Sequence, residues 1–215
     1  MMVAIHGLPF LWKGLLVTLE VSGFVVLVSL VCGVLLGVSI TYGPAWLRLP
    51  IRLYSDVLRG LPLLVLIFFV YYALPLTGWN IGNFWAACTA LALFETAHVL
   101  EVTRGALQSI HPGQGEAGKA IGLTFEQRLA YVIFPQALRR FLPPWINTVV
   151  ATVQGSALVS LVGIVDLMLS VQQVIGRTFR PLPLYVLGAL IYFCINYALS
   201  LASRRLEARF AYVRE

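Results

Sequence analysis

The chain has 215 residues, of which 60% are hydrophobic and only 11% are charged, and its mean hydropathy is +0.88. A water-soluble domain carries about a quarter charged residues, so this composition excludes both a soluble globular protein and a disordered one. The formal net charge is +6, but the basic residues are scattered between apolar segments and form no basic face of the kind that binds nucleic acid. An integral membrane protein is predicted.

Five membrane-spanning helices are predicted, because a helix needs about 20 apolar residues to cross the hydrocarbon core. The first ends before Tyr42-Gly43-Pro44, and its Gly33-x-x-x-Gly37 favours close contact with another helix. The uncharged segment 61–94 is too long for one helix, and a turn at Pro75 and residues 77–83 divides it. The predicted spans are 15–40, 56–76, 84–109, 141–165 and 181–203.

The basic residues also indicate the orientation of these spans. Twelve of the 15 follow spans one, three and five, and only Lys13, Arg177 and Arg180 lie on the other side. Cytoplasmic segments of membrane proteins are enriched in Lys and Arg. The N-terminus is therefore predicted to lie outside and the C-terminus in the cytoplasm.

One cytoplasmic loop, residues 110–142, has structure of its own. His111-Pro112-Gly113 ends the third span, a short helix is predicted over 114–121, and Gly122 suits its C′ position. Thr124 and Gln127 predict a capping box for a second helix, which Pro135 is expected to end before Pro143-Pro144 begin the fourth span. A short exposed helix like the first is suited to docking a partner, although a helix lying on lipid explains the pattern equally well.

Several motifs, in order, carry a resemblance to a known family. Glu116-Ala117-Gly118, Gly122 and Val132-Ile133-Phe134-Pro135 resemble the "EAA" loop of bacterial ABC-importer permeases. Four further motifs resemble the branch of that family that takes up polar amino acids. In chain order they are Arg59-Gly60-Leu61-Pro62-Leu63, Glu101-x-x-Arg104-Gly105, Pro135-Gln136-Ala137-Leu138-Arg139 and Pro143-Pro144-x-x-Asn147. The resemblance covers about 14–207.

The resemblance implies an all-α membrane protein of the type I ABC importer fold, with a single permease domain over 1–215, in the bacterial cytoplasmic (inner) membrane. It implies a transport subunit and not an enzyme, which moves a polar amino acid by alternating access. ATP and Mg²⁺ are then bound by a partner ATPase, and no cofactor is expected in this chain, which has no G-x-x-x-x-G-K-[ST] phosphate loop. The implied partners are an ATPase dimer, a second permease subunit, an external or periplasmic solute-binding protein, membrane lipid and the substrate, and no nucleic acid.

The resemblance also assigns the docking of the ATPase to the helix at 113–122, which moves when ATP closes the ATPase dimer. Small residues there allow close backbone approach, and Glu116 can bond to the ATPase or cap the helix. Gly118 stands where the family usually has alanine, which is expected to loosen the helix. The coupling residues are Gly113, Gln114, Glu116, Ala117, Gly118, Ala120 and Gly122.

Span three carries charged and polar residues whose presence in a membrane needs an explanation, because a charge at the centre of a span costs about 2.5–3.5 kcal/mol. Glu101 and Arg104, three residues apart, are predicted to form a structural pair. Glu95 either lines the translocation path, where it can hold an ammonium or cationic group of the substrate, or pairs with His98 or with a partner permease. Glu95-x-x-His98 has the spacing of a di-iron site, but no second copy exists, so no metal is expected.

Span four carries Gln154-Gly155-Ser156 where the family has a helix break near the membrane midplane. The candidate pathway residues are therefore Glu95, His98, Gln154 and Ser156. The lysine and the acid that the family often has here are missing, which favours a heterodimer in which a different permease carries the fuller site. Asp166, at the outer end of the span, is expected to stay in contact with water.

Two other classes of membrane protein fit the sequence less well. A secondary transporter or a channel for a small polar solute usually has an internal repeat, and the two halves of this chain do not resemble each other. A membrane enzyme needs convergent catalytic groups on several helices, and only Glu95 and His98 are candidates. Both alternatives leave the cytoplasmic docking loop unexplained.

Overall fold

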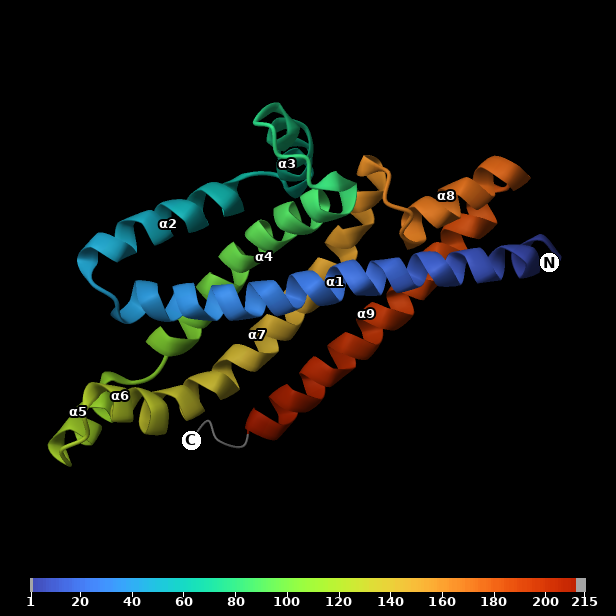
Figure 1. Cartoon of the computed structure of the whole chain (residues 1–215). Coiled ribbons are helices and arrows are strands. Elements are labelled where there is room, and N and C mark those ends of the chain that lie inside the picture. The colour runs from blue at the N-terminus through green and yellow to red at the C-terminus, as the bar shows by residue number, and fades with distance from the viewer. Residues whose placement is uncertain (1, 212–215) are drawn as a thin grey trace.

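Helices form nearly all of the described chain. The computed structural model describes the backbone of residues 2–211 and the side chains of residues 9–208, and it has no strand within that range. Its α-helices, drawn in Figure 1, are α1 (Met2–Tyr42), α2 (Ala45–Gly60), α3 (Leu63–Leu76), α4 (Gly82–Gln108), α5 (Pro112–Ala120), α6 (Phe125–Arg128), α7 (Phe134–Gly155), α8 (Leu167–Thr178) and α9 (Pro181–Ala211). A π-helical turn (Leu129–Ile133) precedes α7, and a 3-10 segment (Ser156–Val162) follows it.

The described helices include enough apolar segments for the five predicted crossings. Four helical runs are long and apolar enough to span a membrane, and the pair α2 and α3 meets the same test together. The runs are Pro9–Tyr42, Gly82–Gln108, Phe125–Val162 and Pro181–Ala208. The prediction of five spans is therefore confirmed when the pair counts as one.

The predicted span over 56–76 is not one continuous helix. The axes of α2 and α3 differ by 107°, and the chain between them is extended, with ψ of 139° at Leu61 and 131° at Pro62. A residue before proline is driven away from the helical region, and proline itself has no N–H for the helical ladder. Leu61-Pro62 therefore ends α2 and turns α3 away.

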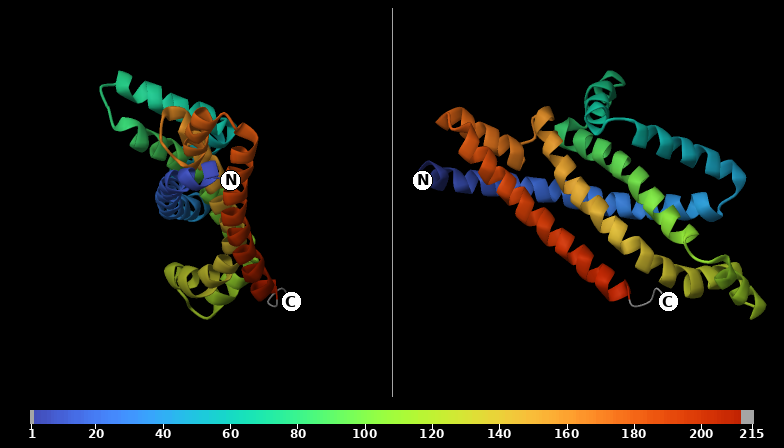
Figure 2. Two further views of the ribbon diagram at one scale, coloured as in Figure 1. Left: turned by 90° about the vertical axis from the view of Figure 1, so that its right-hand side faces the viewer. Right: turned by 180° about the vertical axis from the view of Figure 1, so that it is seen from behind.

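Helix α4 is the centre of the fold. It contacts α1 most extensively, and α7, α3 and α2 pack on its other sides (Figures 1 and 2). Gly33 and Gly37 of α1 make the closest approach: a Cβ at Gly33 would lie 2.6 Å from Cβ of Val99, and one at Gly37 would lie 2.5 Å from Cβ of Thr103. The predicted packing role of the two glycines is confirmed.

Helix α7 runs through positions where the sequence analysis expected breaks. Pro135 does not end the second cytoplasmic helix, and Pro143 and Pro144 lie inside α7 instead of beginning it. A proline in a helix deprives the carbonyl four residues earlier of its donor. Before Pro135 the ladder shifts to a π-helical turn, in which the N–H of Phe134 bonds to the carbonyl of Leu129, so the helix continues.

Helix α8, which the sequence analysis did not predict, joins α7 to α9 at the outer end of the molecule. Its N-cap is Asp166, whose carboxylate accepts hydrogen bonds from the Leu169 N–H (2.9 Å) and the Tyr192 hydroxyl (3.3 Å). The Leu167 N–H donates to the hydroxyl of Thr18 on α1 (3.1 Å). Asp166 is fully buried, so the expectation that it stays in contact with water is wrong: three helices converge on it.

Candidate functional site

Helix α5 lies at the cytoplasmic end of the molecule, beyond the ends of α4 and α7 (Figure 1). It begins at Pro112, two residues before the predicted start, because the ring of His111 caps it by accepting from the Gly113 N–H (3.1 Å). At its other end Gly122 has φ of 82°, and the N–H groups of Gly122 and Leu123 bond to the carbonyls of Lys119 and Gly118 at 3.0 Å each. This is a Schellman ending, so the prediction of Gly122 at C′ is confirmed.

A second set of contacts ties α5 to the chain that follows it. The capping box is present: the Gln127 N–H donates to the Thr124 hydroxyl (3.3 Å), and the Thr124 N–H donates to the Gln127 side chain (3.0 Å). The Arg128 guanidinium donates to the Gly115 carbonyl (3.4 Å). The amide of Gln136 donates to that of Gln114 (3.3 Å). Helix α5 is thus held at both ends and along one side.

Gly118 is buried where α5 meets the side chain of Arg128. A Cβ at this position would lie 2.9 Å from Cγ of Arg128, closer than an undisturbed side chain permits. The glycine thus makes room for an arginine that bonds back to α5. Glycine at this position leaves the space that the Arg128 side chain occupies. The expectation that Gly118 loosens the helix did not include this contact.

The opposite side of α5 is open to solvent. Glu116, Ala117 and Ala120 are exposed, and Ile121 just beyond is 77% exposed. Because His111 provides the N-cap, Glu116 is not needed as a cap, and its carboxylate forms no ion pair with any basic side chain that the structure describes. The helix therefore presents a small-residue face with one carboxylate.

Glu101 is the centre of a polar cluster between α2 and α4. The Arg104 guanidinium contacts its carboxylate at 2.6 Å through Nη2 and 2.9 Å through Nε. Two groups of α2 join them: the Ser55 hydroxyl donates to Glu101 at 3.1 Å, and Arg59 lies 3.9 Å away. The spacing of Glu101 and Arg104 predicts the first contact. The contacts from α2 were not predicted, because the pairing of α2 with α4 is not local in the sequence.

Glu95 is 3% exposed and lies on the face of α4 that packs against α7. Its polar neighbour there is Thr152. Nδ1 of His98 is 3.0 Å from the Phe94 carbonyl, and within the described part of the chain Glu95 and His98 form no ion pair. Of the alternatives for Glu95, pairing with His98 is therefore not the arrangement seen.

The break in span four falls where the sequence analysis expected it. Helix α7 ends at Gly155, and Ser156 begins the 3-10 segment with its hydroxyl bonded to the Val153 carbonyl (2.8 Å). Ser156 is fully buried and stands four residues after Thr152, so both lie on one face of the helix. Gln154 faces away and lines a largely apolar cavity of about 400 Å³ against α8 and α9.

The structure thus separates the four candidate pathway residues. Glu95 lies in the buried contact of α4 and α7 together with Thr152, which the sequence did not indicate, and Ser156 is buried at the start of the 3-10 segment that follows α7. His98 is half-buried, and Gln154 opens on the other side of α7. Among the described residues no group of three or more His, Cys, Asp or Glu side chains could hold a metal ion.

Comparisons with known proteins identify the family of this chain. Residues 29–212 match the model of the family described as binding-protein-dependent transport system inner membrane component. The chain is 38% identical to the probable glutamine ABC transporter permease protein GlnP of Bacillus subtilis, over 94% of both chains. It is 32% identical to a second protein of that organism, the probable glutamine ABC transporter permease protein GlnM, over 73% of this chain and 72% of the other.

A solved structure resembles the whole fold. It is a crystal structure of an amino acid ABC transporter with histidines, which matches with a TM-score of 0.90 at 31% identity and covers 97% of both chains. The chain belongs to the family of inner membrane components of binding-protein-dependent transport systems, and it is accordingly a multi-pass permease subunit of an ABC importer and not itself an enzyme.

Proposed function

We propose that this permease subunit imports a polar amino acid and that α5 couples the movement of the membrane helices to a partner ATPase. The observation that carries the proposal is the form of α5: a short helix capped at both ends, tied along one side by Arg128 and Gln136, and exposed on the other. The amino-acid and glutamine permeases among its relatives support the substrate class.

Coupling follows from the rigidity of these ties. A helix that the Schellman ending and the capping box fix to α6 and α7 transmits a push on its exposed face to the membrane helices. ATP and Mg²⁺ belong to the ATPase in this proposal. The permease contributes the small-residue face of Ala117 and Ala120 and the carboxylate of Glu116 as the docking surface.

Glu95 is the residue proposed to meet the substrate. A buried carboxylate in a span is costly unless it is paired, and the side chains near it supply the hydroxyl of Thr152 but no cation. An amino-acid substrate brings an ammonium group, which supplies the missing charge.

A second, different permease is the proposed membrane partner. Gln154 and Ser156, which flank the break at Gly155, are polar but uncharged, so they offer little charge to a substrate carboxylate. A mixed pair lets the other chain supply it. The two Bacillus subtilis relatives, GlnP and GlnM, are different chains that share the description of a glutamine ABC transporter permease, which favours this proposal.

A pull-down tests these partners. The tagged full-length chain is purified from its native membranes in mild detergent, and the co-eluting chains are identified by mass spectrometry. An ATPase together with a second permease is the expected result, and an ATPase alone would replace the mixed pair by a homodimer. If no ATPase co-elutes, and none is trapped by cross-linking at a cysteine placed at Glu116, the coupling role of α5 is wrong.

A further inference from the structure

A basic cavity lies between α1, α2 and α4 near their cytoplasmic ends. Its volume is about 380 Å³, and three arginines line it: Arg48 and Arg52 from α2, one helical turn apart, and Arg104 from α4. Their neighbours in the lining include Thr41, Leu49 and Gln108, and no carboxylate lines the cavity among the residues that the structure describes.

The three guanidinium groups keep donors free for a ligand. Each guanidinium has five N–H donors. Arg48 uses Nε to bond to the Gly43 carbonyl (2.8 Å), which fixes its direction at the turn between α1 and α2. Arg104 gives Nε and Nη2 to Glu101 and Nη1 to the amide of Gln108 (2.8 Å). Arg52 donates to no acceptor that the structure describes, so its whole fork is available.

The nearby carboxylates neutralise only part of this charge. Glu101 pairs with Arg104, also contacts Arg59 and Ser55, and does not line the cavity, so it offsets the charge of Arg104 alone among the three arginines of the lining. Asp56, one turn beyond Arg52, forms no ion pair within the described residues. Arg48 and Arg52 therefore have no acidic partner among the described residues, and they line one cavity with the paired Arg104. Like charges this close are stabilised when an anion binds between them.

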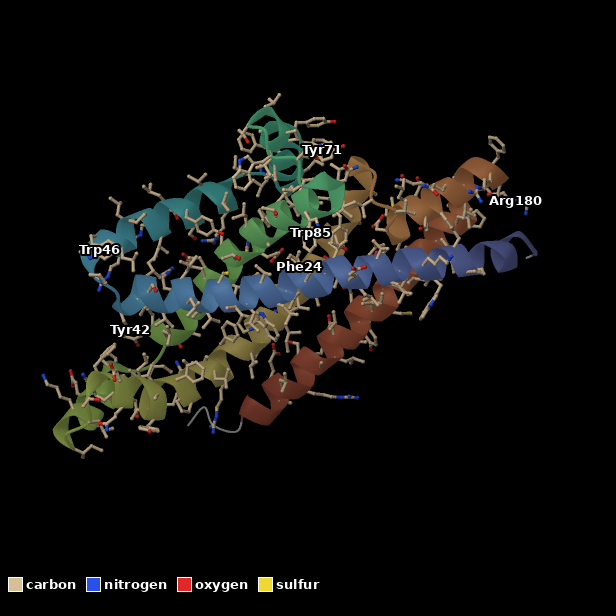
Figure 3. All side chains as sticks on the ribbon, viewed as in Figure 1. Phe24, Tyr42, Trp46, Tyr71, Trp85 and Arg180 are labelled. Carbon is tan, nitrogen blue, oxygen red and sulfur yellow. The ribbon has the colours of Figure 1, made fainter. Side chains whose placement is uncertain are left out.

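The outer face of α2 beside the cavity is apolar. Leu49, Leu53 and Val57 recur every four residues and are 63%, 55% and 55% exposed. Trp46, labelled in Figure 3 at the turn from α1 to α2, is 75% exposed. Tryptophan at the end of a span is typical of the membrane–water interface, which places the arginines at the depth of the lipid headgroups.

We propose that this cavity binds the headgroup phosphate of an anionic phospholipid of the cytoplasmic leaflet. The phosphate oxygens accept from the fork of Arg52 and from the free donors of Arg48 and Arg104, a geometry that arginine favours. The acyl chains lie along Leu49, Leu53 and Val57. Basic pockets between membrane helices on this side are suited to anionic headgroups, and the lipid fastens α2 to α1 and α4.

Native mass spectrometry of the assembled transporter tests the site. The delipidated complex is titrated with phosphatidylglycerol, with phosphatidylcholine, and with inorganic phosphate alone. Each basic side chain near an anionic membrane surface contributes about a factor of five in affinity. R48Q/R52Q is therefore expected to weaken the tightest phosphatidylglycerol binding by about 25-fold, and R52Q alone by about fivefold. Phosphatidylcholine is expected to bind weakly to the wild type and to both variants.

R204Q/R205Q is the matched control, because these two exposed arginines lie at the cytoplasmic end of α9 and outside the cavity. It removes the same charge from the same leaflet and should bind phosphatidylglycerol like the wild type. If R48Q/R52Q does not fold, R52Q alone still tests the site, because it breaks no bond within the described chain. Equal affinity of R52Q and the wild type, or displacement of the lipid by inorganic phosphate, would overturn it. So would unchanged lipid binding combined with loss of the ATPase from R52Q, which would make the cavity a protein contact.

Discussion

Glu95 is a carboxylate with 3% exposure in the central helix of a membrane protein, and no basic side chain that the structure describes forms an ion pair with it. E95Q keeps the shape of the side chain and removes its charge. A hydrogen bond to a charged group contributes about 1.5–3 kcal/mol, so we expect amino-acid uptake to fall by roughly tenfold to a hundredfold while the complex still co-purifies. E20Q is the matched control, since Glu20 is on an exposed face of α1. Wild-type uptake by E95Q would remove Glu95 from the pathway.

Gly118 and Arg128 form a matched pair, since the methyl group of an alanine would meet the Arg128 side chain. Alanine is favoured over glycine in a helix by about 0.5–1 kcal/mol. We expect G118A to stabilise the chain in an R128A background, where the space is free, and to give little or no gain in the wild type, where Arg128 must move off the Gly115 carbonyl.

The unfolding temperatures of the four proteins, measured by intrinsic tryptophan fluorescence in detergent, give this coupling as a double-mutant cycle. If the effects of G118A and R128A simply add, the two residues are independent and the glycine at this position has another cause.

Asp166 fastens α1, α8 and α9 at the outer end, and burial raises its pKa to about 6. In the unfolded chain the carboxyl titrates near 4, so the folded state holds the proton more tightly and stability rises as the pH falls from about 6 towards 4. Asparagine is also a good N-cap. We therefore expect D166N to be at least as stable as the wild type at pH 8 and to lose that advantage as the pH falls through 6.

D166A is the companion to this variant, because it removes the cap itself. It should lie about 0.5–2 kcal/mol below D166N at every pH, measured by thermal unfolding. A D166N variant that is as unstable at pH 8 as D166A would show that the charge, and not the cap, holds the junction.

The helices show where sequence reasoning succeeds and where it stops. Apolar length located the spans in α1, α4 and α9, and the Thr124 capping box and Gly122 located the local caps, because these signals are complete within a few residues. The effect of proline was predicted wrongly at two positions, once by missing a break and once by expecting one. Leu61-Pro62 breaks a helix that its composition made continuous, whereas Pro135 is accommodated by a π-helical turn, and which of these occurs depends on the packing around each proline.

The ending of α5 offers a direct test of its rigidity. Gly122 has φ of 82°, where a residue with a Cβ costs about 1–2 kcal/mol. Gly115 of the same helix has space for a Cβ, with no atom within 4 Å. We expect G122A to lower ATP-driven uptake several-fold by loosening α5, and G115A to transport like the wild type.

The amount of each variant in the membrane is measured in parallel, so that lower uptake by G122A can be distinguished from a lower amount of protein. Equal uptake by G122A and G115A would mean that coupling does not depend on how α5 ends.

The fold as a whole could be predicted further than its site. Composition, the 12-to-3 distribution of basic residues and the ordered motifs predicted a five-span permease with a cytoplasmic coupling helix. The family match confirms the permease, and the coupling role of the helix stays a proposal. The partners of individual polar residues could not be predicted. Ser55 and Arg59 reach Glu101 from another helix, Thr152 meets Glu95 across a helix contact, and Asp166 is buried by three segments, all through contacts distant in sequence.

As a subunit of an ABC importer, this chain should take part in transport that is driven by ATP, and uptake into proteoliposomes measures that property. The purified complex is reconstituted with its solute-binding protein on one side and ATP on the other, and radiolabelled polar amino acids are supplied without an ion gradient. We predict uptake of at least one of them that requires ATP and stops when the ATPase is inhibited. Uptake that proceeds without ATP and follows an imposed ion gradient would instead make the chain a secondary transporter.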